Sequence, residues 1–386
     1  MSVSAVPHDV RELATRALEV AEAKVDGLVK RDPDFLPLFT EAGKWRHGKE
    51  AWTRWCDGFL AGQMWILAER TGSPRWRARA ERYSRALKGR EFDRDVHDLG
   101  FVFWPTWRRW FEKTGEESLD AVLIQAGRTM SLRFDERAGF LCSFLAPNST
   151  FIDIMMNVGI IFYAAQRAGD ARLRTVADAH ATSTRRHLVR GDGSTAHEGI
   201  FDLETGEFLR QSTQQGWRSD SSWARGQAWA LYGFGTCHAF TRDERYLDVA
   251  MRCADYYIER TGSGGVPPND WDEPNPRLQF ESSAAAIAAS GLLQLAALVH
   301  DPLRATRYRD YGFDVLRALC SDTFLADSDS KWEGVVKHAS YHERKGLGVD
   351  ESVMWGDYFF VEALDKCLGA DWLVNARTST TVGTAP

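Results

Sequence analysis

The stretch QRAGDARL, residues 166–173, joins two helical patterns of different character, and corners of the same kind recur along the chain. Each corner follows an apolar segment rich in small and aromatic residues, and each precedes an amphipathic segment with Arg and Glu on its outer face. The other four corners are ERTGSPRW (69–76), EKTGEESL (112–119), FTRDERYL (240–247) and VHDPLRATRY (299–308). The repeat predicts fully buried helices that alternate with half-exposed ones.

Each kind of helix is expected six times. The buried kind is expected at about 51–70, 98–113, 151–168, 222–241, 281–299 and 350–368. The exposed kind is expected at about 9–30, 74–90, 117–134, 171–190, 244–260 and 304–320. The first exposed helix lacks a preceding buried partner and the last buried helix lacks a following exposed one, so the two ends can pair and close a ring. We therefore predict an all-α fold, an (α/α)6 barrel of six inner and six outer helices. The alternative is an open helical solenoid or binding scaffold.

The composition indicates one globular domain, expected over residues 1–375 with a short polar tail at 376–386. The formal net charge is −6 and Lys and Arg form no dense run, so nucleic acid is not an expected partner. Neither an apolar window of 18 residues nor a signal-peptide pattern is visible, so we expect a cytoplasmic protein without a membrane partner, a monomer or a weak homo-oligomer. The six cysteines lie far apart without CxxC spacing, so free thiols are expected, with neither a metal nor a cofactor.

The chain is rich in aromatic residues, with 15 Trp, 21 Phe and 10 Tyr. These rings suit either a large core or a cleft that binds a sugar, because the C–H faces of a sugar stack on aromatic rings. The composition leaves both readings open.

The N-terminal ends of the six inner helices favour the cleft, because they carry charged, polar and Trp residues where buried helices should be apolar. Their sequences are WTRWCDGF (52–59), DVHDLGF (95–101), TFIDIMMN (150–157), SSWARGQAW (221–229), FESSAAA (280–286) and GVDESVMWGD (348–357). Since the inner helices of such a barrel run parallel, these ends meet at one mouth, where unpaired N–H groups favour anions. Trp223, Arg225 and Trp229 are expected at its rim, with Arg225 and Trp229 on one helix face at i, i+4.

Two aspartates at this mouth are candidates for acid–base chemistry. Asp98 follows His97, and Asp153 lies in the apolar setting FIDIMM, which should raise its pKa and keep it partly protonated. A carboxylic acid held in this way can donate a proton, and a second carboxylate across the mouth would raise the pKa further. The alternative for each is an ordinary helix N-cap.

Two loops are expected to overhang the same mouth. His197, in GDGSTAHEG, and Gln215, in QQGW, precede the fourth inner helix. The tract GVVKHASYHERKGLG, residues 334–348, precedes the last one, and its Ser340, His342 and Lys345 can line an outer subsite. Solvated surface loops are the alternative for both.

At these residues the chain resembles the unsaturated glucuronyl hydrolases of glycoside hydrolase family 88. The matching motifs are HDLGF around Asp98, DIMMN around Asp153, His197 with Gln215, W-x-R-G-Q-A-W from Trp223 to Trp229, and WGDYFFVEAL at 355–364. They occur in family order over about residues 52–364. The family fold is an (α/α)6 barrel, in agreement with the helix count.

The resemblance implies an enzyme that hydrolyses short oligosaccharides made by polysaccharide lyases, with a 4-deoxy-4,5-unsaturated uronate at the non-reducing end. In this chemistry Asp153 protonates C4 of the vinyl ether and helps water reach C5, after which the hemiketal rearranges and expels the remaining sugar. Asp98 holds ring hydroxyls and tunes Asp153. The resemblance also assigns seven residues to the substrate pocket: His197, Gln215, Trp223, Arg225, Trp229, Trp55 and Phe59. We expect Arg225 to bind the uronate or its hydroxyls, because a guanidinium fork suits a carboxylate.

Two departures from the family pattern concern the second sugar. GFLCSF places Phe144 where family members commonly have Trp, which predicts weaker or altered stacking. Members that prefer sulfated fragments carry a Ser-x-x-Ser-x-Lys-like pattern, whereas SYHERK keeps Ser340 and Lys345 but has Glu343 at the second Ser. A carboxylate repels a sulfate, so we predict a reduced preference for 6-sulfated substrates.

Three alternative functions are considered. An unsaturated rhamnogalacturonyl hydrolase shares the barrel and the chemistry but acts on pectin fragments; HDLGF favours the glucuronyl type. A sugar epimerase would need His pairs in the cavity, for which His97 and His197 are the plausible candidates. A non-catalytic sugar-binding scaffold would retain binding without turnover.

Overall fold

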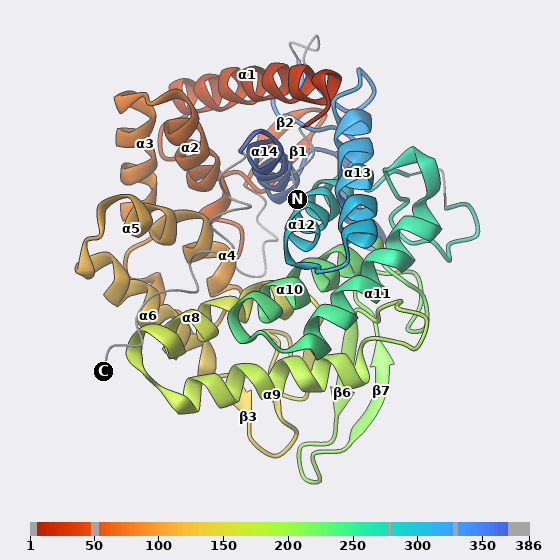
Figure 1. Ribbon diagram of the computed structural model, residues 1–386. Coiled ribbons are helices and arrows are strands. Elements are labelled where there is room, and N and C mark those ends of the chain that lie inside the picture. Colours follow the sequence, from red (N-terminus) through yellow and green to blue (C-terminus); the bar gives the residue numbers. More distant parts are fainter. Residues whose placement is uncertain (1–5, 48–53, 277–278, 327–330, 370–386) are drawn as a thin grey trace.

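The computed structural model describes residues 6–369 except 48–53, 277–278 and 327–330, and within these ranges its helices form a closed double ring (Figure 1). The outer helices are α1 (His8–Arg31), α3 (Pro74–Arg85), α6 (Glu117–Ser131), α9 (Ala171–His187), α11 (Glu244–Thr261) and α13 (Pro302–Leu319). The inner positions are filled by α2 (Gly58–Thr71), α4 (Leu99–Phe103) with α5 (Arg109–Thr114), α7 (Ile154–Asn157) with α8 (Gly159–Ala168), α10 (Ala224–Thr241), α12 (Ser282–Leu298) and α14 (Met354–Leu368). The ring closes where α1 packs against α14 and α13. The predicted (α/α)6 barrel is confirmed.

The inner helices are buried on nearly all sides, as their apolar and small residues predict. Helix α12, SSAAAIAASGLLQLAAL, is buried along almost its whole length, whereas α13 buries one stripe that contains Tyr308, Phe313 and Leu316. The outer helix α9 begins at a true N-cap, because the side chain of Asp170 accepts hydrogen bonds from the N–H groups of Arg172 and Leu173. The sequence therefore predicted the corners of the chain, because each corner separates a fully buried helix from a half-exposed one.

A glycine allows two inner helices to start close together. A Cβ atom on Gly100 would lie 2.6 Å from the Cα atom of Asn157, so only glycine fits at this position. The approach brings the beginning of α4 against α7, and these are the two segments that follow Asp98 and Asp153.

Four predicted inner helices have different bounds in the structure. The helix expected at 51–70 begins at Gly58. The helix expected at 98–113 is interrupted by a π-helical turn, Trp104–Arg108, which contains Pro105. The helix expected at 151–168 begins at Ile154, because Ser149–Phe151 forms a strand. The last helix, expected from 350, begins at Met354, because Asp350 and Glu351 end a strand.

Short strands in the described part of the chain were not predicted. They form four small antiparallel sheets, β1–β2, β3–β4, β5–β6–β7 and β8–β9. Their bounds are β1 (Phe39–Glu41), β2 (Lys44–Arg46), β3 (Phe134–Asp135), β4 (Phe140–Leu141), β5 (Ser149–Phe151), β6 (Glu198–Phe201), β7 (Phe208–Ser212), β8 (Ala339–His342) and β9 (Leu347–Glu351). The connections expected as loops are thus partly paired with one another, because backbone groups that pass over a buried site need hydrogen-bond partners.

Two predictions concern the chain as a whole. None of the described helices is both long and apolar enough to cross a bilayer. The polar tail at 376–386 lies outside the described residues, and the single domain over 1–375 stays a prediction.

Candidate active site

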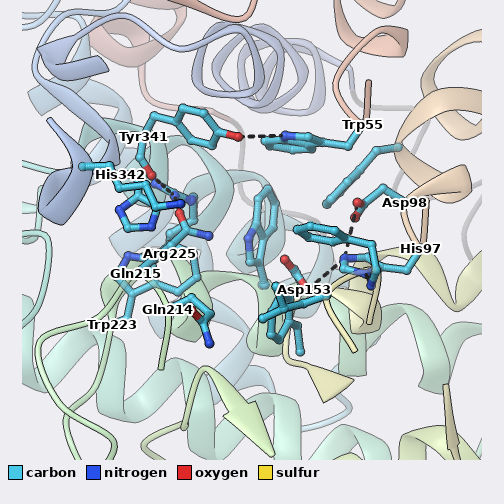
Figure 2. Close-up of a pocket in the computed structure, with 16 residues that line it drawn as sticks. Trp55, His97, Asp98, Asp153, Gln214, Gln215, Trp223, Arg225, Tyr341 and His342 are labelled. Carbon is cyan, nitrogen blue, oxygen red and sulfur yellow. Dashed lines mark hydrogen bonds and ion pairs between the residues drawn. The ribbon is translucent and has the colours of Figure 1, made fainter. Parts of the chain in front are cut away.

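A pocket opens at the N-terminal ends of the inner helices, where the sequence predicted it (Figure 2). Its lining consists of Trp55, His97, Asp98, Phe101, Phe144, Leu145, Phe151, Asp153, Gln214, Gln215, Trp223, Arg225, Trp229, Tyr341, His342 and Lys345. These residues come from α4 and α10 and from the segments that precede α2, α4, α7, α10 and α14. Carboxylates therefore meet aromatic rings in one cavity.

Asp98 and Asp153 occupy N-cap positions, yet neither side chain caps its helix. Asp98 precedes α4 and Asp153 precedes α7, and no side-chain cap hydrogen bond is formed at either start. Instead, Asn157 Nδ2 lies 3.1 Å from Asp98 Oδ1 and 3.2 Å from the carbonyl oxygen of Asp153, donating to both. The Oδ1 atom of Asp153 is buried and accepts no hydrogen bond from the described residues. Both carboxyl groups are thus available for chemistry.

His97 stands between the two carboxyl groups. Its Nε2 atom lies 3.3 Å from Asp98 Oδ2 and 3.6 Å from Asp153 Oδ1. The backbone N–H of Phe144 donates to the Nδ1 atom of His97 over 2.9 Å, so Nδ1 is the unprotonated nitrogen of the neutral ring. The ring is neutral because burial lowers the pKa of His97 well below its usual value. The protonated Nε2 atom therefore lies close to both carboxyl groups without forming a hydrogen bond to either of them in the described structure.

Burial raises the pKa values of both aspartates. The pKa of Asp153 is raised to about 7, chiefly by burial and against the opposing charge of Arg225. The pKa of Asp98 is raised well above its usual range by burial and then by the charge of Asp153. The two groups titrate as a pair, and at neutral pH the pair retains a proton that can be donated. The predicted rise in the pKa of Asp153 is confirmed.

The same three residues are close enough to be considered as a metal site. Ligand atoms of His97, Asp98 and Asp153 lie within 4.8 Å of one another. A metal ion on Nε2 of His97 would require the ring proton on Nδ1, where it would face the N–H of Phe144. The donor set therefore does not fit a metal ion, and it suits proton transfer instead.

Arg225 is held by protein acceptors on both of its terminal nitrogens. Nη1 donates to the carboxylate of Glu281 and, over 2.6 Å, to the carbonyl oxygen of Ser340. Nη2 donates to Gln215 Oε1 over 2.5 Å and to the carbonyl oxygen of Tyr341 over 2.8 Å. The guanidinium also lies over the ring of Trp223, with Cζ 4.3 Å from its centroid. Arg225 thus joins the segment before α10 to strand β8 beneath the pocket.

Comparison with known proteins finds relatives over most of the chain, although no family model matches it. An unsaturated glucuronyl hydrolase of Bacillus sp. (strain GL1) is 34% identical over 325 residues, which cover 81% of this chain and 85% of the relative. An unsaturated chondroitin disaccharide hydrolase of Streptococcus pyogenes serotype M1 is 32% identical, with 81% and 80% covered. The crystal structure of an unsaturated glucuronyl hydrolase specific for heparin superposes with a TM-score of 0.86 at 26% identity, over 92% of this chain and 97% of that one.

The chain belongs to the unsaturated glucuronyl hydrolase family. The resemblance predicted from the motifs is confirmed, and the ring of inner-helix starts is the part of the barrel that carries those motifs.

Most of the aromatic residues expected in the pocket of this family member lie there. Trp55, Phe144, Trp223 and Trp229 line the cavity. Phe59 does not, because it is fully buried and packs against Phe101, Tyr358 and Phe359 in the core below Trp55. The prediction that Phe59 contacts substrate is therefore wrong for this structure.

The correction for Phe59 has a direct test. Phe59→Ala is expected to lower the free energy of unfolding by about 3–5 kcal/mol, because it leaves a cavity in the core. Trp55→Ala is the matched variant one helical turn away, and it should mainly raise KM, because Trp55 is half-buried at the pocket wall. Chemical denaturation and steady-state kinetics on both variants separate the two roles. A Phe59→Ala protein of parental stability and raised KM would restore the original prediction.

The guanidinium of Arg225 is placed in the pocket as predicted but does not offer a free fork. Its Nη groups already meet Glu281, Gln215 and two carbonyl oxygens. Both Nη groups are thus occupied, and the contact of Arg225 with the uronate or its hydroxyls stays a prediction. Arg225 can still offer Nε–H and positive charge, because an arginine carries five donors.

The remaining predicted residues divide between the lining and the layer behind it. Gln215 and Lys345 line the pocket. His197 lies behind, where its Nδ1 atom accepts the backbone N–H groups of Gln214 (3.1 Å) and Gln215 (3.3 Å). Ser340 is also buried outside the lining, and its carbonyl oxygen serves Arg225. The His–Gln spacing of the motif is thus explained by a contact between the two segments.

Several lining residues were not among the predicted site residues. His97 carried one signal, its position directly before Asp98, but its tautomer depends on Phe144, which lies 47 residues away. Gln214 and Tyr341 flank predicted residues. Phe101, Leu145 and Phe151 carried no distinguishing signal, because apolar side chains near a helix start are usually core.

Proposed function

We propose that this chain removes the 4,5-unsaturated uronate from the non-reducing end of short, lyase-generated oligosaccharides. The observation that carries the proposal is the proton-retaining pair of Asp98 and Asp153 beneath an aromatic pocket, in a chain of the unsaturated glucuronyl hydrolase family. The names of the relatives point to glycosaminoglycan fragments as the substrate class.

Asp153 is the proposed proton donor to C4 of the double bond. Its buried, unpartnered Oδ1 atom and its pKa of about 7 suit an acid that works near neutral pH. Once C4 holds the proton, water adds to C5 and gives a proton back to the Asp153 carboxylate, so the enzyme is restored. The hemiketal at C5 then opens, and the remaining sugar leaves from C1. Because attack at C1 is not needed, the carboxylate spacing of ordinary glycosidases does not apply.

Asp98 and His97 are proposed to set the pKa of this acid. The charge of Asp153 raises the pKa of Asp98, so the pair retains a proton, whereas the Nε2 atom of the neutral His97 ring lies close to both carboxyl groups and favours their ionised form. Asn157 fixes the orientation of Asp98 through the 3.1 Å hydrogen bond. Asp98 is also proposed to hold ring hydroxyls of the uronate.

The walls of the pocket are proposed to bind the two sugars. Trp55, Trp223 and Trp229 offer stacking faces, and Phe144 is proposed at the leaving sugar. Lys345, exposed at the rim, and the Nε–H of Arg225 supply positive charge for the uronate carboxylate. We propose no metal and no cofactor for the reaction, and no nucleic acid or membrane as a partner. A cytoplasmic location and a monomeric or weakly associated state stay predictions.

The proposed function is tested with unsaturated disaccharides from hyaluronan, chondroitin, heparin and pectin. Loss of the ultraviolet absorbance of the double bond with any of the first three supports the glucuronyl activity and ranks the leaving sugars. Loss with the pectin fragment alone would instead assign the chain to the rhamnogalacturonyl type. Binding without loss on the whole panel would indicate a non-catalytic sugar-binding protein.

Sulfate preference is a second expected result. Glu343 follows the lining residue His342, and its Oε2 atom accepts a hydrogen bond from Asn269 Nδ2 over 2.9 Å. A fixed carboxylate there repels a sulfate, so kcat/KM should be lower for a 6-sulfated chondroitin disaccharide than for its unsulfated twin. Glu343→Ser should narrow the difference, and Glu343→Gln, which keeps the size but removes the charge, should do the same. Turnover of the sulfated substrate well above the unsulfated one in the parent enzyme would contradict this.

A further inference from the structure

Two neighbouring glutamines, Gln214 and Gln215, face the pocket on the side opposite His97 and Asp98 (Figure 2). His197 fixes their backbone, because its Nδ1 atom accepts both of their N–H groups. Their positions are therefore set before substrate enters, and what each presents depends on the orientation of its side-chain amide.

The amide of Gln215 has its oxygen engaged. Arg225 Nη2 donates to Gln215 Oε1 over 2.5 Å, and arginine can only donate. The Nε2 group of Gln215, a donor, is therefore the part left for the pocket.

The amide of Gln214 has the reverse orientation. Its Nε2 group donates to Glu198 Oε2 over 2.9 Å, and Glu198 is 1% exposed. The other carboxylate oxygen of Glu198 accepts from Ser149 Oγ over 2.6 Å, so the carboxylate is held from two sides. Gln214 Oε1 accepts no hydrogen bond from the described residues, and it remains as an acceptor at the pocket.

We propose that Gln214 and Gln215 act as an oriented acceptor–donor pair that requires a free hydroxyl or N–H group at one position of the substrate. Gln214 Oε1 accepts the hydrogen of that group, and Gln215 Nε2 donates to an adjacent oxygen. An O-sulfate has no hydrogen to donate to Gln214 Oε1. It also brings negative charge toward that oxygen and toward the carboxylate of Glu198, which holds the same amide. Gln214 is thus a specificity-determining residue, and Glu198 is the positioning residue that fixes its amide. The inference rests on the proposed function.

The experiment compares unsulfated unsaturated disaccharides with their 2-O-, 4-O- and 6-O-sulfated counterparts. In the parent enzyme at least one sulfated form is expected to have a kcat/KM lower by about tenfold or more, because a site built to bind a hydroxyl rejects a group that cannot donate. Gln214→Ala should lower kcat/KM for the unsulfated substrate by about tenfold and reduce the same sulfate ratio. Glu198→Gln should also reduce the ratio, because the amide of Gln214 is then free to turn and present its N–H groups.

The controls separate specificity from folding. Glu207→Gln changes an exposed glutamate at the far end of the β6–β7 hairpin and should leave every ratio at the parental value. A merely structural role of Glu198 would lower turnover of all substrates equally, with unchanged ratios, and would overturn the inference. A Gln214→Ala variant with the parental ratio of kcat/KM between sulfated and unsulfated substrates would also overturn the inference. Turnover by the parent enzyme tests the proposed function separately. If the parent enzyme leaves the double bond of every disaccharide intact, the proposed function is wrong, and no ratio of sulfated to unsulfated turnover can be measured.

Discussion

Asp153→Asn is expected to lower kcat by about 10²–10⁴-fold, the contribution typical of a positioned general acid. The amide keeps the size of the carboxyl group but has no acidic proton for C4. Because Asp153 does not cap α7, the fold should remain intact and disaccharide binding should change little. Single-turnover loss of the double-bond absorbance, together with binding by calorimetry, measures both quantities.

Asp170→Asn is the matched control for this variant. Asp170 also stands at a helix start, but its side chain caps the outer helix α9 and lies away from the pocket lining. Asparagine is a good N-cap, so stability and turnover should both stay near the parental values. Parental activity in Asp153→Asn would remove Asp153 from the role of proton donor.

Replacing His97 with Phe is expected to move the acidic limb of the pH–rate profile to higher pH by up to about one unit. The protonated Nε2 atom of His97 lies 3.3 Å from Asp98 Oδ2 and 3.6 Å from Asp153 Oδ1, where its partial positive charge favours the ionised carboxylates and holds their pKa values down. A nearby N–H group that forms no hydrogen bond is worth at most about the lower end of the 1.5–3 kcal/mol range for a donor to a charged group, and one pKa unit corresponds to about 1.4 kcal/mol. Protonation of the second carboxylate then begins at higher pH, so activity is lost earlier as the pH falls.

His180→Phe is the control for the His97 variant. His180 is also buried and accepts a backbone N–H at Nδ1, from Leu141 over 3.1 Å, but its Nε2 atom has no hydrogen-bond partner among the described residues. The His180→Phe variant should have a lower free energy of unfolding than the parent enzyme but the same pH–rate profile. His97→Gln, which restores a side-chain N–H donor, should recover part of the shift. An unchanged acidic limb in His97→Phe would limit His97 to a structural role.

The arrangement of the barrel could be predicted because it depends on local patterns. The alternation of buried and half-exposed helices, with a corner between them, predicted a closed ring. Because the inner helices run parallel, the ring also placed Asp98, Asp153, Trp223 and Trp229 at one mouth. The strands were missed because they pair segments distant in the chain, such as β5 with β6. Periodicity reports which residues are buried, but not which partner they meet.

The details of the site depend on those distant partners. Phe59 and Trp55 are one turn apart and equally aromatic, so the sequence did not show which of them faces the core. The fork of Arg225 was expected to be free, but Glu281 and strand β8 occupy it, and these lie 56 and about 115 residues further along the chain. The tautomer of His97 likewise depends on the backbone of Phe144.

The order of two bond changes tests the central claim, that chemistry begins at the double bond. The substrate is the 4-nitrophenyl glycoside of the unsaturated uronate, and one reaction is followed for both the ultraviolet band of the double bond and the release of nitrophenol. We predict that the lost fraction of the double bond equals or exceeds the released fraction at every time, and that Asp153→Asn slows both together. Release of nitrophenol ahead of the loss of the double bond would contradict the account, because it would show direct cleavage at the anomeric carbon.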